Sequence, residues 1–291
     1  MPYLYLVSTL FLSSASGILG SFYNRKTSGM RDATALYNFM ICSASFLGWT
    51  VLFLIQPSFD ARVIPYGIGF GIGYAVCMIG FINALRTGPI SLTTLFLNLS
   101  LIATVIWGFF FWNSDPSILV IIGLVLVAVA LWLCLYTGKE NDGVGKISLK
   151  WLFFVALTFV GNSACAIIQK TQQLHFNGNH GNLMMMCGLC FASLFCLVLY
   201  LRSDKSDSKE ILKKGFGFFP VADGLLNTLH NLIVIILATS TISPSIIYPT
   251  IAIGGLAFTC IFSLIVFKEK LRLWQWIGIA VGAVAVAILS I

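Results

Sequence analysis

Residues 64–86 read IPYGIGFGIGYAVCMIGFINALR, an apolar run in which glycine stands at every second position from Gly67 to Gly73. Because a helix needs roughly 20 apolar residues to cross the hydrocarbon of a bilayer, the run predicts a transmembrane helix. Glycines four residues apart form seams for close helix packing, so Gly67 with Gly71 and Gly69 with Gly73 predict two seams. The same glycines could equally let the helix bend. A phosphate-binding loop is a poor alternative, because such a loop follows a strand.

The composition of the whole chain extends this interpretation beyond one run. Of the 291 residues, 58% are hydrophobic and 9% are charged, and the mean hydropathy is +0.95. A soluble domain has about a quarter charged residues, so this chain suits a bilayer better than water. The sequence predicts an all-α membrane protein with ten transmembrane helices. These are expected at residues 3–23, 33–55, 64–86, 90–112, 116–136, 150–172, 180–201, 215–239, 243–267 and 272–291.

The fourth and fifth expected helices match the ninth and tenth without a gap. A shift of 155 residues superposes identical residues, among them Pro89 on Pro244, Thr104 on Thr259, Gly123 on Gly278, Ala128 on Ala283 and Ala130 on Ala285. This register predicts two five-helix repeats, residues 1–137 and 150–291, joined by a linker at 138–149. Because five is odd, the second repeat must enter the membrane inverted, which is the architecture of many secondary transporters.

The distribution of basic residues indicates the same inversion. The loops after the first, third, fifth, seventh and ninth expected helices hold every lysine and arginine except Arg62 and Lys170. The charge therefore lies in the first and third loops of one half and in the second and fourth of the other. By the positive-inside rule these loops are cytoplasmic and both termini lie outside. The net charge of +7 forms no stripe of the kind that binds nucleic acid.

Two helix junctions carry a family resemblance. Residues 84–91, Ala-Leu-Arg-Thr-Gly-Pro-Ile-Ser, resemble the junction between the third and fourth helices of the EamA-like permeases, in the drug/metabolite transporter superfamily. Residues 267–271, Phe-Lys-Glu-Lys-Leu, with Gln275 and Gly278, resemble the family pattern GE(R/K)L…Q…G, although Lys268 replaces the usual glycine. The first-half copy, residues 113–116, lacks the glutamate.

The resemblance implies ten helices around a central cavity and transport by alternating access. Family members are usually drawn with both termini cytoplasmic, whereas the charge distribution of this chain predicts the opposite. Some members bind cations and protons through a glutamate in the first helix. The runs 3–23 and 150–172 contain no acidic residue, which disfavours a multidrug-cation antiporter of that type.

A polar stripe marks the eighth expected helix. Asp223, Asn227, His230 and Asn231 fall within roughly a 100° arc of a helix, while the other faces carry leucine, isoleucine and valine. Polar groups at bilayer depth usually face a cavity or a partner helix, and we expect these to line a substrate cavity. The alternative is that they hydrogen-bond neighbouring helices. His230 could also couple protons, because imidazole titrates near neutral pH, and so could Asp223.

Other helices offer groups that could face this stripe. We expect Asn162 in the sixth helix and Asn98 in the fourth to line the same cavity, with Asn83 and Tyr248 beside them. Pro249 follows Tyr248 and frees a backbone carbonyl, which predicts a kink there. These groups supply donors and acceptors but no fixed negative charge deep in the membrane. A neutral or zwitterionic polar metabolite therefore fits better than a lipophilic cation.

We expect no catalytic, metal or cofactor site. Cys187 and Cys190 form a CxxC, but the partner ligands of a metal site are missing and all eight cysteines lie in apolar runs. They are expected to be small buried residues.

The sequence favours a secondary transporter of a small polar metabolite, in a multi-pass bacterial plasma membrane. A lipid-linked substrate flippase and a membrane-embedded lipid enzyme are the alternatives. An enzyme would need clustered acids or histidines, and His175, His180 and His230 do not cluster in the sequence. The expected partners are the substrate and the bilayer, with no nucleic acid, and the expected state is a monomer or weak dimer.

Overall fold

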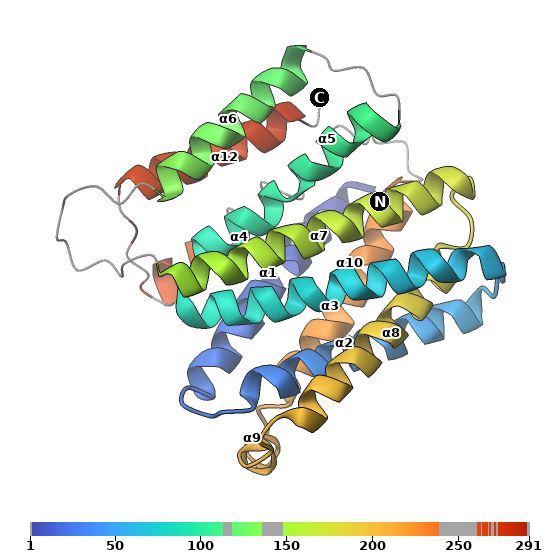
Figure 1. Cartoon of the computed structure of the whole chain (residues 1–291), viewed down its shortest axis with the longest axis vertical. Helices are drawn as coiled ribbons and strands as arrows, with labels where there is room; N and C mark the ends of the chain where they lie inside the picture. The colour runs from blue at the N-terminus through green and yellow to red at the C-terminus, as the bar shows by residue number, and fades with distance from the viewer. Residues whose placement is uncertain are drawn as a thin grey trace.

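The computed structural model describes residues 2–112, 118–135, 148–238 and 273–289, with single positions and short pieces between 261 and 271. All regular structure in these ranges is helical, and a 3₁₀ turn, Ala61–Val63, precedes α3 (Figure 1). The helices are α1 Pro2–Lys26, α2 Ala33–Ile55, α3 Ile64–Thr87, α4 Ile90–Leu99, α5 Leu101–Phe111, α6 Ile118–Leu135, α7 Leu149–His175, α8 Gly181–Arg202, α9 Ser208–Lys213, α10 Phe218–Ala238 and α12 Leu273–Leu289.

Four segments in the described ranges are long and apolar enough to cross a membrane: α2, the segment Ala61–Thr87 that contains α3, α7 and α8. The prediction of an all-α protein with transmembrane character is confirmed. The number of ten spans stays a prediction, because most of the ninth expected helix, 243–267, and the linker up to 147 lie outside the described residues.

The expected helix at 90–112 is interrupted, which corrects the sequence-based interpretation. α4 ends at Leu99 and α5 begins at Leu101, with Ser100 between them. Asn162 of α7 donates a hydrogen bond to the Leu97 carbonyl at 3.2 Å, and Ser163 donates one to the Ser100 carbonyl at 2.9 Å. Side chains that insert into the backbone ladder in this way are a known cause of helix breaks. The segment 202–214, expected to be a loop, likewise contains α9.

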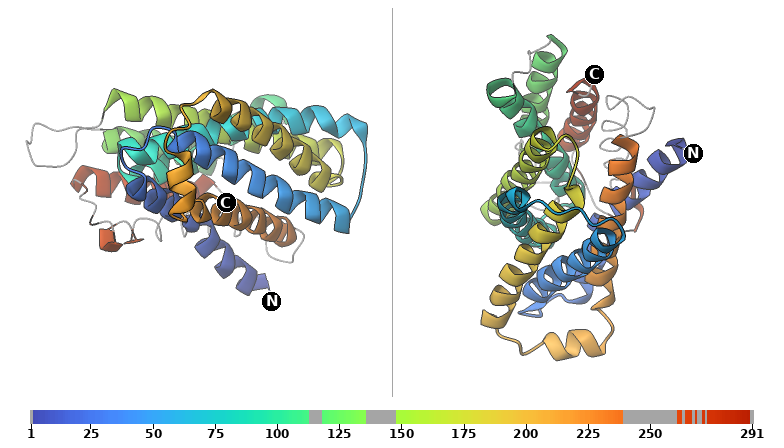
Figure 2. Two further views of the ribbon diagram at one scale, coloured as in Figure 1. Left: turned by 90° about the horizontal axis from the view of Figure 1, so that it is seen from below. Right: turned by 90° about the vertical axis from the view of Figure 1, so that its right-hand side faces the viewer.

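The helices pack as a chain of neighbours with α3 at its centre. α3 lies between α7 and α8, α8 packs on α2, and α10 packs on both α2 and α1. α6 pairs with α12 at one edge of the helix group (Figures 1 and 2), and α12 also packs on α4. In Figure 1 both ends of the chain lie at the side of the molecule opposite to the turn between α1 and α2.

The two glycine seams predicted for α3 are present, and each contacts a different helix. A Cβ at Gly71 would lie 2.2 Å from the Gly188 carbonyl oxygen of α8, and one at Gly67 would lie 2.8 Å from Cys187 Cβ. A Cβ at Gly73 would lie 3.1 Å from the sulfur of Cys165 on α7, and one at Gly69 would lie 3.2 Å from Ile168 Cδ1. The spacing of four therefore separates an α8 seam from an α7 seam.

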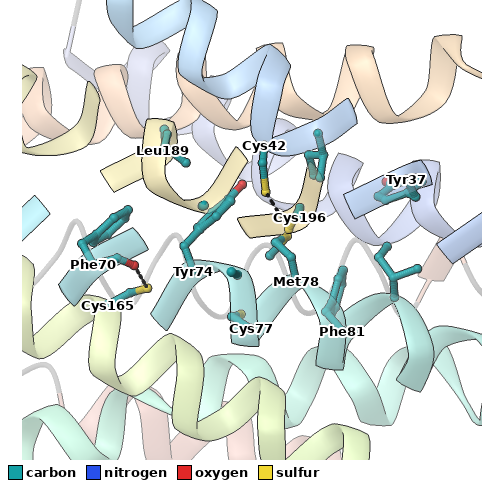
Figure 3. Packing of buried hydrophobic residues seen from close by; sticks show 14 of the residues in the cluster. Tyr37, Cys42, Phe70, Tyr74, Cys77, Met78, Phe81, Cys165, Leu189 and Cys196 are labelled. Carbon is teal, nitrogen blue, oxygen red and sulfur yellow. Dashed lines mark hydrogen bonds between the residues drawn. The ribbon is translucent and has the colours of Figure 1, made fainter. Parts of the chain in front are cut away.

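Aromatic and sulfur-containing side chains fill the core beside these seams (Figure 3). Phe70, Tyr74 and Phe81 of α3 are buried there. Cys42 of α2 and Cys196 of α8 face each other with their sulfurs 3.8 Å apart. The six cysteines whose side chains the structure describes are free thiols, and four of them are buried, whereas Cys187 and Cys190 are half-buried.

The loops gather at two ends of the molecule. At one end, Arg86 in the last turn of α3 donates to the carbonyls of Thr27 and Met30 in the α1–α2 turn. Arg31 of that turn pairs with Asp204 of the α8–α10 loop at 3.5 Å. At the other end, Ser58 Oγ lies 2.5 Å from His180 Nδ1 and so joins the α2–α3 loop to the α7–α8 loop. The α1–α2 turn, the end of α3 and the α8–α10 loop, all expected on one side of the membrane, thus meet at the first of these ends.

The two basic residues that break the charge pattern each have a local partner. Arg62 forms an ion pair with Asp60 at 2.7 Å, and its guanidinium lowers the pKa of that carboxyl to about 2. Lys170 lies over the ring of Trp112, 4.6 Å from its centroid. Because Asp60 compensates the charge of Arg62, the α2–α3 loop gains no net positive charge from it.

Candidate functional site

Asp223 of α10 forms the centre of a buried polar cluster between the two halves of the chain. Asp223 is 1% exposed, and its Oδ2 accepts hydrogen bonds from Tyr37 Oη at 2.5 Å and Ser16 Oγ at 3.2 Å. Its Oδ1 has no partner among the described residues. Three helices therefore meet at one carboxyl group: α1 and α2 from the first half and α10 from the second.

Small residues let α10 approach α2 at this point. A Cβ at Gly224 would lie 2.6 Å from the Ile41 carbonyl oxygen, and one at Gly48 would lie 2.8 Å from Thr228 Oγ1. The Ser45 hydroxyl donates to the Gly224 carbonyl at 3.0 Å. The glycine beside Asp223 thus fixes the distance between the helices, so that the neighbouring carboxyl reaches Tyr37.

Tyr37 is itself held in place by its surroundings. Its ring packs against Tyr23 of α1 with centroids 4.8 Å apart, and both rings are fully buried. Tyr23 Oη donates to the Ala33 carbonyl at the start of α2 at 2.7 Å. The tyrosine pair therefore ties the end of α1 to the start of α2 and orients the hydroxyl that Asp223 accepts.

The polar stripe of α10 runs along α1. The ring of His230 lies within hydrogen-bond reach of the Thr9 backbone, two turns from the contact between Asp223 and Ser16. The separation of seven residues is the same on both helices, as antiparallel neighbours require. His230 Nδ1 has no partner among the described residues.

Asn227 and Asn231 interact chiefly with each other. Both are half-buried, and Asn231 Nδ2 donates to the Asn227 carbonyl at 2.8 Å and to its Oδ1 at 3.2 Å. These bonds lie within one helix, so they do not join α10 to a neighbouring helix.

The other predicted cavity residues lie elsewhere. At the break between α4 and α5, Asn162 Nδ2 donates hydrogen bonds to the Leu97 carbonyl and to Ser100 Oγ, the latter at 2.6 Å. Asn98 and Asn83 each donate to a carbonyl of their own helix, at 2.9 Å and 2.8 Å. Within the described ranges no hydrogen bond joins any of them to the α10 stripe, and Tyr248 lies outside those ranges. A single cavity that contains all of them stays a prediction.

Sequence reasoning did not find Tyr37, Ser16 or Gly224. A tyrosine near the start of an apolar run is common at membrane interfaces and gives no signal of a buried partner. The signal was Asp223 itself, because a carboxyl in an apolar helix needs donors, but only the folded chain shows which residues supply them.

Chemically, this cluster is a carboxyl group that can change its hydrogen bonding. As a carboxylate, Asp223 can only accept hydrogen bonds, and its Oδ2 accepts them from the hydroxyls of Tyr37 and Ser16. Once protonated, it can also donate one. No cation of the described residues forms an ion pair with it. The arrangement can therefore take up and release a proton while changing the bonds between α10 and the first half.

The fold has counterparts among known structures. The protein-family models contain no match, and the curated proteins contain none. Among solved structures, 28 chains match. One, described as "Crystal structure of protein", shares 12% sequence identity with a TM-score of 0.56, over 97% of this chain and 96% of that one. The likeness concerns the fold alone.

Proposed function

We propose that the chain is a secondary active transporter, which moves a small polar metabolite by alternating access between two inverted five-helix halves. The observation that carries the proposal is the buried Asp223 carboxyl at the contact of the two halves, whose hydrogen bonds among the described residues come from the hydroxyls of Tyr37 and Ser16. Buried ionisable groups of this kind in membrane proteins mark ion and substrate pathways.

The pairing of the helices supports the inverted halves. Let α1 correspond to α7, α2 to α8, α3 to α10 and α6 to α12. A two-fold rotation that superposes one half on the other then places the α3–α7 pair on the α10–α1 pair, and the α3–α8 pair on the α10–α2 pair. The α2–α8 and α6–α12 pairs map onto themselves, as pairs on a two-fold axis must. All of these pairings are present, and they are those that a repeat of the kind found in secondary transporters requires.

Asp223 is the coupling group in this proposal. As a carboxylate it holds α10 against α1 and α2 through two charge-assisted hydrogen bonds. Protonation removes the charge and turns one oxygen into a donor, so these bonds weaken and α10 can shift against the first half. Each proton that binds thus favours one access state, which couples a proton gradient to transport.

The test uses purified protein in proteoliposomes that contain a pH-sensitive dye. Pools of neutral and zwitterionic metabolites are added, and internal pH reports proton movement; a pool that acts is then resolved to one labelled compound. We expect Asp223→Asn to abolish accumulation driven by a proton gradient while exchange of labelled for unlabelled compound continues. Asp204→Asn, in the exposed loop, is the matched control and should behave as wild type.

The outcome decides between the proposed function and its alternatives. If Asp223→Asn accumulated the compound at the wild-type rate under a proton gradient, Asp223 would not be the group that couples transport to protons. Movement of a lipid-linked sugar in place of any soluble compound would favour a flippase. His230→Ala and Asn227→Leu, which alter the predicted cavity, should lower transport while the protein still inserts and folds.

We also propose that the basic loops face the cytoplasm of a bacterial cell, with both termini outside. The meeting of the α1–α2 and α8–α10 loops at one end supports this, because it gathers their lysines and arginines on one side. A cysteine at the exposed Ser206, in a background without reactive native cysteines, should resist membrane-impermeant thiol reagents in intact cells. Ready labelling from outside would reverse the orientation.

A further inference from the structure

A cavity of about 380 Å³ opens where α1 and α3 end and α4 begins. One face of α1 supplies Ser21, Asn24 and Arg25, and Ser28 follows in the turn after α1. Arg86, at the end of α3, lines it as well. The cavity lies at the basic end of the molecule, Asp223 is not among its lining residues, and its volume is within the range of small-ligand pockets.

The described residues of this pocket give it a positive charge. Arg25 and Arg86 line it, and none of its described lining residues is an aspartate or glutamate. Arg86 is half-buried and donates to neutral acceptors, the Thr34 hydroxyl at 2.5 Å and the carbonyls of Thr27 and Met30. It forms no ion pair with a described residue. A partly buried cation without a counter-ion is costly, so an anion bound here would be stabilised.

The wall also contains neutral polar groups that lack partners. Ser21 and Asn24 are 3% and 7% exposed, and Ser21 Oγ and Asn24 Oδ1 have no hydrogen-bond partner among the described residues. Asn24 Nδ2 donates to the Ile82 carbonyl at 3.1 Å, which holds its Oδ1 in place. A hydroxyl can donate or accept and an amide oxygen accepts, so the wall suits a ligand that bears hydroxyl groups as well as charge.

We propose that this pocket binds a phosphate ester that carries hydroxyl groups. Two guanidinium groups on different helices can contact different oxygens of a tetrahedral phosphate, whereas a planar carboxylate offers only two. α4 begins at Ile90 in the pocket wall, and its N-terminal end adds a partial positive charge. The source is either the headgroup of phosphatidylglycerol or a soluble polyol phosphate. The proposal does not depend on the proposed transport function.

A simpler role for both arginines is to complement the C-terminal ends of α1 and α3, where basic residues are common. That role requires neither a cavity nor unpartnered polar atoms in its wall. If this were their only role, replacing Arg25 would affect ligand binding no more than replacing another basic residue at the end of a helix, such as Arg202 of α8. Arg202 therefore supplies the matched control.

The test measures binding of glycerol 3-phosphate to detergent-solubilised protein, and of phosphatidylglycerol to the protein by native mass spectrometry. Arg25 is exposed, so Arg25→Gln should fold normally. We expect it to weaken binding by at least about tenfold, since hydrogen bonds to charged groups contribute about 1.5–3 kcal/mol. Arg86→Lys keeps the charge but loses the planar fork, and should weaken binding less than Arg25→Gln. Arg202→Gln should bind as wild type.

Each outcome bears on the proposal. Binding of glycerol 3-phosphate that Arg25→Gln weakens and Arg202→Gln does not supports the site with a soluble ligand. The same pattern for phosphatidylglycerol alone supports the site with a lipid headgroup. Absence of binding by both probes, or equal loss in Arg25→Gln and Arg202→Gln, overturns it. Because no transport is measured, failure here leaves the test of Asp223 unaffected.

Discussion

α3 and α10 each pack most extensively against two other helices, but they do so through different atoms. α3 meets α7 and α8 through glycines, where backbone lies against backbone and there is no room for a methyl group at Gly71. α10 also uses a glycine against α2, but it meets α1 through the polar side chains of Asp223 and His230. By the proposed two-fold relation the two helices are counterparts, so the same scaffold position carries two kinds of contact.

The difference separates a fixed contact from an adjustable one. A glycine seam depends on shape and offers a single close-packed arrangement, because a shift would separate the backbones or make them collide. Hydrogen bonds to a carboxyl can form or break when the carboxyl binds or releases a proton, so the proton concentration shifts the equilibrium between the two arrangements. We therefore expect α3 to move as one body with α7 and α8, and the contact of α10 with α1 to change between states.

The largest expected effect is on the α8 seam of α3. Gly71→Ala places a Cβ 2.2 Å from the Gly188 carbonyl, against backbone that cannot yield, and should greatly reduce the monodisperse fraction on size exclusion in detergent. Gly69→Ala meets only the flexible end of Ile168 at 3.2 Å and should cost much less. Gly181→Ala, with nothing within 4 Å, should be neutral. Equal behaviour of the three variants would contradict the seams.

Tyr37→Phe tests the polar contact of α10. It keeps the ring packed on Tyr23 but removes the stronger donor to Asp223, and should lower stability by about 1–3 kcal/mol. The thermal unfolding midpoint in detergent measures the loss. In combination with Asp223→Asn the two losses should not add, because both variants change the same hydrogen bond between Tyr37 and Asp223. Full additivity would show that the hydroxyl and the carboxyl act separately.

A smaller effect is expected at the break between α4 and α5. Asn162→Leu removes two hydrogen bonds to another segment, at Leu97 and Ser100, and should lower stability by about 1 kcal/mol. Asn98→Leu is the control, because its amide bonds only its own helix, and it should change the unfolding midpoint less. The reverse order would mean that α7 does not stabilise the break.

The smallest effect is expected in the α2–α3 loop. Asp60 is ionised in the native state at neutral pH and accepts hydrogen bonds from Arg62. Because its native pKa is lowered to about 2, its stabilising contribution is present above the unfolded pKa and is lost only as the pH falls toward about 2. The small difference in unfolding midpoint between wild type and Asp60→Asn should therefore stay constant from about pH 5 to about pH 8. A change across that range would contradict the assignment.

Much of the fold could be predicted from the sequence, because the relevant signals are local. Length and hydropathy located the long apolar helices within a few residues, as at 33–55 and 180–201. The spacing of Gly67, Gly69, Gly71 and Gly73 predicted two packing seams, since positions four apart share a face of a helix whatever lies beside it. The lone carboxyl of the eighth expected helix marked Asp223 as a residue that needs partners.

The tertiary structure alone decided which partners those were. Tyr37 and Ser16 stand 186 and 207 residues before Asp223 in the chain, and no local pattern connects them. The break at Ser100 depends on Asn162 and Ser163, which reach it from another helix. Arg25 and Arg86 came together only because α1 and α3 end at the same place. The sequence by itself determined where the helices form, because burial in lipid and backbone hydrogen bonding act within one segment. The sites arise where side chains of distant segments meet, and the packing of the helices sets those contacts.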